Sequence, residues 1–426
     1  MNTNLKHVKQ VILIACTLSI TAACSDSQDS TSGAGFSGAQ SGSGSTNTTF
    51  DKQQMVNDLV DHVYLPAIED VLVNAQNQLV AVESYCEALQ ANQAEDATLK
   101  TTAQEAWKNT MYSWQQVEMM QVGPVGTDES YLRNQIYSWP VDSQCAVDLD
   151  VSYFENGNVS GSPYDIKNRT ANRKGLDALE HLLFTESLAH SCKTDSLGPK
   201  GWNDRPELER KVARCKFATE VASDLVATAG ELSSAWSSEN GSNTIIDFET
   251  SLKTANDSNS NSSFENIDAA INHLTDGLFY LDTITKDAKL GSPIGLITNS
   301  CGTSTCLNDI ESNISKHSLA NVQSNLEAML LIFQGSDPAT QLAFDDYLTA
   351  VDAKSLANEM RADITAAIAA IESFETEGSF ADAVQNNPAR VQELYAQTKK
   401  VTDNLKSAFI VFLSLQLPSS SAGDAD

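Results

Sequence analysis

The sequence predicts an all-α protein made of two helical domains, each of the four-helix-bundle type. In several long segments, apolar residues recur at positions i, i+3, i+4 and i+7, the spacing of one face of an α-helix. Convincing strand alternation appears nowhere, and the polar stretch 237–263, which contains NDSNSNSS, interrupts the helical pattern. We therefore expect one bundle over residues 51–236 and a second over 264–418, with 237–263 as a polar linker or loop.

The chain begins with the features of an export signal. Lys6 and Lys9 precede an apolar run from Val11 to Ile20, and the small-residue sequence TAAC follows at Thr21–Cys24. This order resembles a bacterial lipoprotein signal, in which residues 1–23 are removed and Cys24 carries the lipid. A plain secretory signal cut nearby is the alternative, whereas a spanning helix would need a longer apolar run.

The residues after the signal are polar, and the whole chain is acidic. Residues 24–50 are mainly Ser, Gly, Thr, Asn and Gln, so we expect a flexible tether there. Over 426 residues, 56 Asp and Glu against 27 Lys and Arg give a net charge of −29. Such a surface repels phosphate backbones, which argues against nucleic-acid binding.

The helices of the first bundle follow from apolar stripes and their terminators. The first helix begins near Lys52, continues to about Leu89 and should bend at Pro66. The second runs from about Leu99 to Gln121, where VGPVG ends it. The remaining elements expected in this half are a helix at 129–137, an irregular connection at 141–166, and helices at 168–189 and 206–236.

The second bundle shows the same periodicity. Helical stripes return at about 264–288, 307–333, 338–372 and 383–415.

Six cysteines lie beyond the signal and Cys24, and an even number in an exported protein indicates disulfides. The sequence alone leaves the pairing open. Short separations favour Cys192–Cys215 and Cys301–Cys306, which would leave Cys86–Cys145 as the third pair.

The segment Arg173–Phe184, RKGLDALEHLLF, carries charged groups within an apolar helical pattern. At about 100° per residue, one stripe consists of Leu176, Leu179 and Leu183, and another of Asp177, Glu180, His181, Phe184 and Leu188. Because a solvated face would not need large apolar residues, we expect the second stripe to face a cleft between helices. Carboxylates in a cleft cost desolvation free energy unless they are paired or bind a cation.

Two explanations of these acids stay open. Two carboxylates at i and i+3 with an adjacent imidazole can share a metal ion, as in other helical bundles. Alternatively, Arg133, Arg169 or Arg173 neutralises them. HExxH, GxSxG, P-loop and paired CxxC motifs are absent from the sequence, so it carries no signature of a zincin peptidase, an α/β-hydrolase or a P-loop nucleotide site.

Four stretches together resemble the imelysin-like family of bacterial envelope proteins: AWKNTMYSWQQVEMMQVGP at 106–124, RKGLDALEHLLF at 173–184, DTITKDAKLGSPIG at 282–295 and LSLQLPSSSAGDAD at 413–426. The resemblance runs from about residue 52 to the C-terminus. It implies two four-helix-bundle-like domains, a site in a cleft between helices, a lipid-anchored or periplasmic location and a link to iron uptake. It also brings a peptidase label.

The hallmark of that family is GxHxxE on a helix. Gly175 and Glu180 match it, Asp177 stands at the histidine position, and His181 follows the glutamate. The resemblance also extends to a glutamate before a Gly-Pro turn, here Glu118. It thus implies a metal site of Asp177, Glu180, Glu118 and His181, with Gly175, Trp107, Arg133 and Arg173 as cleft or charge partners.

The replacement of histidine by Asp177 changes the ligands on offer. Oxygen ligands from Asp177, Glu180 and Glu118 suit Ca²⁺, Mg²⁺, Mn²⁺ or Fe³⁺ better than Zn²⁺. The same acids would bind no metal if Arg133 or Arg173 neutralised them.

We therefore expect an imelysin-like envelope lipoprotein that binds a metal ion, iron or another divalent cation, or a small ligand, and serves metal uptake. Its expected partners are the membrane, through the lipid on Cys24, and envelope iron-uptake proteins. Ser25 after the anchor favours the outer membrane, facing the periplasm. The alternatives are a metal-dependent peptidase with Glu118 or Glu180 as general base, and a scaffold that binds another envelope protein.

Overall fold

The computed structural model describes residues 50–418, apart from 128–129, 238–246 and 376–377. The expected signal, Cys24, Ser25 and nearly all of the tether lie outside the described residues, as does the end of the C-terminal stretch. Contacts group the chain from Phe50 onward into one compact unit. The division of this unit into bundles at 51–236 and 264–418 stays a prediction.

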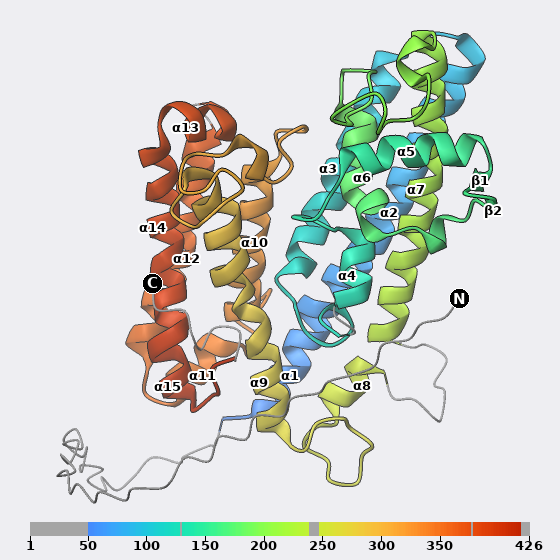
Figure 1. Cartoon of the computed structure of the whole chain (residues 1–426). Coiled ribbons are helices and arrows are strands. Elements are labelled where there is room, and N and C mark those ends of the chain that lie inside the picture. Colours follow the sequence, from blue (N-terminus) through green and yellow to red (C-terminus); the bar gives the residue numbers. More distant parts are fainter. Residues whose placement is uncertain (1–49, 128–129, 238–246, 376–377, 419–426) are drawn as a thin grey trace, which may run out of the picture. The chain divides into compact units, whose positions relative to one another are not determined.

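The first half of the chain is built of helices, as expected (Figure 1). Helix α1 (Lys52–Leu59) continues through a π-helical segment (Val60–Tyr64) into α2 (Leu65–Asn92). Pro66 is the second residue of α2, two positions after the π-helical segment ends, so a helix irregularity is present next to this proline. The further helices of this half are α3 (Ala97–Glu118), α4 (Tyr131–Ile136), α5 (Gln144–Glu155), α6 (Gly175–Phe184), α7 (Glu207–Trp236) and α8 (Phe248–Lys253).

The second half is also helical, with more interruptions than the sequence pattern predicts. Its elements are α9 (Ile267–Leu278), a π-helical segment (Leu281–Gly291), α10 (Ser318–Gln334), α11 (Phe344–Ala350), α12 (Lys354–Glu375), α13 (Phe380–Asn386), α14 (Pro388–Asn404), a second π-helical segment (Leu405–Phe409) and α15 (Ile410–Leu413). The helix expected from residue 307 begins only at Ser318. The helix expected over 338–372 is split before Lys354, where Asp352 has a positive φ of 63°.

Two segments expected to be irregular contain regular structure. Helix α5 lies within 141–166, because Ser143 caps it by accepting from Ala146 N, and Val147 and Val151 bury one face. A short antiparallel hairpin follows, β1 (Asn158–Val159) paired with β2 (Ser162–Pro163). Helix α8 lies within the expected linker.

The core is formed by helices that pack in two groups. Helix α2 packs against α3 and α7, and α6 packs against α3 and α7. In the second half, α12 and α14 pack together and α10 packs on α12, while α10 also contacts α3. Four tryptophans are almost fully buried: Trp107, Trp114, Trp202 and Trp236. Within the described ranges, no helix combines the length and the apolar character that crossing a bilayer requires.

The disulfides correct two of the three expected pairings. Cys86 pairs with Cys215 and joins α2 to α7, and Cys145 pairs with Cys192. Only the expected Cys301–Cys306 loop is confirmed. The favoured pair Cys192–Cys215 was wrong because the packing of α2 on α7 brings together residues 129 positions apart, and sequence separation does not report that packing.

Candidate functional site

Gly175 and Trp107 fix the position of α6. Gly175 begins the helix with a φ of +74°, and a Cβ there would lie 2.5 Å from the carbonyl oxygen of Ile136. Only glycine adopts this conformation readily and allows so close an approach. Trp107 is buried in α3 and donates from Nε1 to the carbonyl oxygen of Leu176 over 3.0 Å. The start of α6 is therefore held by α3 and by the end of α4.

The polar face of α6 is covered, as the sequence predicts, but loop segments rather than a helix provide the hydrogen bonds. Asp177 Oδ2 accepts from the backbone N and the Oγ of Ser138, at 2.5 and 2.8 Å. Glu180 is 7% exposed, and its Oε1 accepts from Ser315 N over 2.8 Å. Residues 135 positions apart thus meet on this face.

Asp177 and Glu180 line a cavity of about 150 Å³, together with Asp142. Tyr137 and Trp139 form part of its wall, and the segment that includes Ser312 and Asn313 forms another part. Among the described residues that line this cavity, none is Lys, Arg or His. We call Asp142, Asp177 and Glu180 the acidic cavity group.

All three carboxyl groups have raised pKa values. Loss of contact with water raises the pKa of Asp177 well above its usual range, and repulsion from Asp142 and Glu180 adds to it, against the hydrogen bonds from Ser138. Burial is also the main cause that raises the pKa of Glu180 to about 7 and the pKa of Asp142. The group thus lacks the positive charge that would hold all three acids ionised.

His181 does not line this cavity, which corrects its expected place beside Asp177 and Glu180. Its Nε2 lies 3.0 Å from Asp148 Oδ1, and its Nδ1 lies 3.0 Å from Thr185 Oγ1. Arg214 donates to the same Asp148 oxygen over 3.0 Å. Burial opposes ionisation of Asp148, but His181 and Arg214 outweigh it and lower the pKa of this carboxyl.

Glu118 belongs to a separate buried network. It is fully buried at the end of α3, with Arg133 Nη2 at 2.7 Å and Lys289 Nζ at 3.4 Å. Lys289 Nζ also lies 3.0 Å from Glu311 Oε1 and donates to Gln115 and Asn325. We call Gln115, Glu118, Arg133, Lys289, Glu311 and Asn325 the Lys289 network.

The two acids of the Lys289 network differ in pKa. Burial opposes the ionised form of Glu118, but Lys289 and Arg133 outweigh it and lower its pKa. Burial raises the pKa of Glu311, and repulsion from Glu118 adds to it, while Lys289 opposes the rise. Tyr137 lines the acidic cavity and donates to Glu311 over 3.0 Å, so the cavity and the network share one wall.

The structure therefore divides the expected four-residue site among three places. Asp177 and Glu180 share the cavity, Glu118 lies in the Lys289 network, and His181 binds Asp148. Arg133 pairs with Glu118, as expected for a charge partner. Arg173 pairs instead with Asp150 at 2.7 Å, together with Arg169, and so does not neutralise Asp177 through the expected one-turn contact.

The donors around the cavity are hard oxygen atoms, which suit Mg²⁺, Ca²⁺, Mn²⁺ or Fe³⁺. In the part of the chain that the structure describes, no three His, Cys, Asp or Glu side chains are arranged closely enough to hold one metal ion directly. The chemical type of the donor atoms around the cavity thus suits a cation. Three carboxylates could contact that cation directly only if their side chains rotated.

Several residues of this region were missed by sequence reasoning. Asp142 lines the cavity, and Ser138 and Ser315 donate to Asp177 and Glu180. Asp142 and Ser138 lie in connecting segments, and Ser315 lies in a stretch for which the sequence pattern predicts a helix but which is a loop in the structure. Lys289 lies in the stretch 282–295, which carries two lysines, Lys286 and Lys289, and both are buried, so lysines within that helical stretch were the available signal.

The chain matches the model of the Imelysin family over residues 64–407. Iron-regulated protein A of Synechococcus elongatus is 27% identical over 131 residues, which cover 31% of this chain and 31% of that protein. The chain thus aligns with about a third of the length of this curated relative.

Two crystal structures share the fold. An imelysin-like protein from Psychrobacter arcticum has a TM-score of 0.63 and 15% identity, over 86% of this chain and 96% of that chain. A candidate iron-regulated protein A precursor from Parabacteroides distasonis has a TM-score of 0.62 and 18% identity, over 85% and 95%. Because the family model matches most of the sequence, the chain belongs to the imelysin family.

Proposed function

We propose that this protein binds a cation in the acidic cavity and serves the uptake of iron or another metal in the cell envelope. The observation that supports it is the acidic cavity group: three carboxyl groups meet at one cavity, and each has a raised pKa. A cation between them would offset their mutual repulsion and would favour the ionised forms.

The size of the cavity supports a partly hydrated ion. One water molecule takes up roughly 30 Å³ of the liquid, so about 150 Å³ has room for an ion and several waters. Waters that bridge the ion to Asp142, Asp177 and Glu180 would make direct contact to all three carboxylates unnecessary. Mg²⁺ and other hard cations commonly keep part of their hydration shell in proteins.

The names of two relatives support iron as the metal. They are described as iron-regulated protein A or a candidate precursor of it. A lipid on Cys24 and the tether at 24–50 would hold the protein at the outer membrane, within reach of envelope uptake proteins. The signal-like order of residues 1–24 supports this location.

Titration calorimetry of the full mature chain with Fe³⁺ citrate, Mn²⁺, Mg²⁺ and Ca²⁺ tests the cavity. We expect one ion per chain in the wild type and at least a tenfold weaker affinity in Asp177→Asn and in Glu180→Gln. Glu69→Gln is the matched control, since Glu69 is exposed on α2 and does not line the cavity. Equal affinity in all four proteins, with unchanged helical circular dichroism, would refute the proposal.

A further inference from the structure

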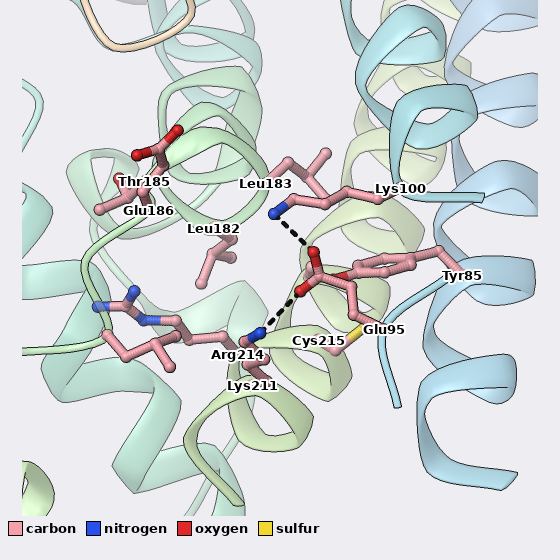
Figure 2. A pocket seen from close by; sticks show the side chains of 12 residues that line it. Tyr85, Glu95, Lys100, Leu182, Leu183, Thr185, Glu186, Lys211, Arg214 and Cys215 are labelled. Atoms are coloured by element: carbon pink, nitrogen blue, oxygen red, sulfur yellow. Dashed lines mark hydrogen bonds and ion pairs between the residues drawn. The ribbon is translucent and has the colours of Figure 1, made fainter. Parts of the chain in front are cut away.

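A second pocket, of about 240 Å³, lies between α2, α3, α6 and α7 (Figure 2). Its lining includes Lys100, Lys211 and Arg214 together with apolar side chains. These three basic side chains stand against two acids of the lining, Glu95 and Glu186, in a chain with a net charge of −29. The pocket shares none of its lining residues with the acidic cavity.

A carboxylate of the protein itself lies between the two lysines. Glu95, from the connection between α2 and α3, has Oε1 3.0 Å from Lys100 Nζ and Oε2 3.1 Å from Lys211 Nζ (Figure 2). Burial works against the ionised form, but the two lysines outweigh it and lower the pKa of Glu95. The pocket therefore already recognises a carboxylate with one ammonium group for each oxygen.

Arg214 supplies a buried positive charge in the pocket wall. The residue is 3% exposed, and its two Nη atoms donate to Asp148 and to the carbonyl oxygens of Ser187 and Ala189. Its Nε has no hydrogen-bond acceptor among the described residues. Because this Nε is enclosed by protein atoms and the Nη atoms are already paired, Arg214 contributes positive charge to the pocket and not a direct contact to a ligand.

The rest of the lining fits a branched hydrocarbon group. Leu182, Leu183, Leu188 and Ala218 face the pocket. The Cys86–Cys215 disulfide ties α2 to α7 at this wall, which keeps the pocket preformed. Glu186 also lines the pocket but is exposed, so solvent and salt screen its charge.

We propose that this pocket binds a small organic carboxylate with a branched apolar body of about the size of a leucine side chain. In the structure, the side chain of Glu95 takes the place of the ligand carboxylate, and it swings outward when the ligand binds. Glu95 lies in a connection outside the helices and is exposed, so this movement leaves α2 and α3 in place.

Calorimetry of the full mature chain with 4-methylpentanoate tests the proposal. We expect weak binding to the wild type and at least tenfold tighter binding to Glu95→Gln, which keeps the size of the side chain but frees both lysines. The neutral amide of the same acid should bind at least tenfold more weakly than the acid. In the Glu95→Gln background, Lys100→Met or Lys211→Met should remove the gain.

Lys108→Met in the same background is the control, because Lys108 also lies on α3 but pairs with Glu105 and does not line the pocket. N-acetylglycyl-leucine presents the same end group as part of a peptide. Binding of either acid supports the proposal, and the tighter of the two identifies the source of the carboxylate.

Equal binding of acid and amide, or no binding to folded Glu95→Gln, would overturn the proposal and leave Glu95 as a structural ion-pair partner. Cation affinity at the acidic cavity, measured on the same samples, should be unchanged in every variant. The two proposals can therefore fail separately.

Discussion

Replacing Lys289 with methionine tests whether one ammonium group compensates the buried acids of the Lys289 network. Lys289 is almost fully buried, and its Nζ lies 3.0 Å from Glu311 and 3.4 Å from Glu118. Without it, Glu118 keeps Arg133, whereas Glu311 is left with the neutral donors Tyr137 and Gln115. Removing one member of a buried ion pair costs about 3–5 kcal/mol.

The loss of stability should depend on pH, because protonation of Glu311 removes the uncompensated charge. An unfolded glutamate has a pKa of about 4.3, and the pKa of folded Glu311 is already raised. The folded state of the variant then keeps a proton that the unfolded state has released, so stability falls as pH rises. We expect a loss of ~3 kcal/mol or more at pH 8 and a clearly smaller loss at pH 5.

Urea unfolding followed by circular dichroism measures these differences. The double variant Lys289→Met/Glu311→Gln should recover most of the loss, because it removes the uncompensated charge as well. Lys108→Met, which breaks an exposed pair, should change the free energy of unfolding by less than about 1 kcal/mol. A loss for Lys289→Met as small as that of Lys108→Met, or no recovery in the double variant, would refute the reasoning.

Three further predictions concern Glu180, the disulfides and Gly175. Because the pKa of Glu180 is raised to about 7, the wild type should lose up to about 3 kcal/mol between pH 4.5 and 8 relative to Glu180→Gln, as urea unfolding at both pH values would show. Replacing Cys86 and Cys215 with serine opens a loop of 129 residues and should lower the free energy of unfolding by about 5 kcal/mol. Replacing Cys301 and Cys306 opens a much shorter loop and should lower it by about 2 kcal/mol, and calorimetric melting of both variants compares the two losses. Gly175→Ala places a methyl group against the Ile136 carbonyl at a position with left-handed backbone, so it should lower the free energy of unfolding by about 3 kcal/mol or more. It should also alter the near-ultraviolet circular dichroism of Trp107, which binds the first turn of α6. An unchanged spectrum and unchanged stability would contradict the role of Gly175 in positioning α6.

The sequence predicts the helical class well because apolar periodicity reports directly which face of a segment is buried. It fails where a short element depends on local capping, as at α5, whose Ser143 cap and two buried valines lie in a stretch with many turn-forming residues. It also fails for long-range pairings. The Cys86–Cys215 bond depends on how α2 packs on α7, which no local pattern encodes.

The candidate site shows the same limit. Helical geometry correctly places Asp177 and Glu180 on one covered face of α6. The same geometry gives no information about which segment covers each residue. It therefore predicts His181 beside Asp177 and Glu180, whereas in the structure His181 binds Asp148. Asp142 lies in a connecting segment, and Ser315 lies before α10 where the sequence pattern predicts a helix, so only tertiary packing brings these two residues to α6.

The hydrogen bond from Ser315 to Glu180 has a mechanical consequence. The wall of the cavity on the Ser312 side comes from a part of the chain far removed in sequence from α6. A cation bound by residues of both α6 and the Ser312 segment would stabilise the contact between them and would slow their separation. Loaded protein should therefore resist limited proteolysis longer than empty protein, with the delay greatest for cuts within the segment around Ser312 and Ser315.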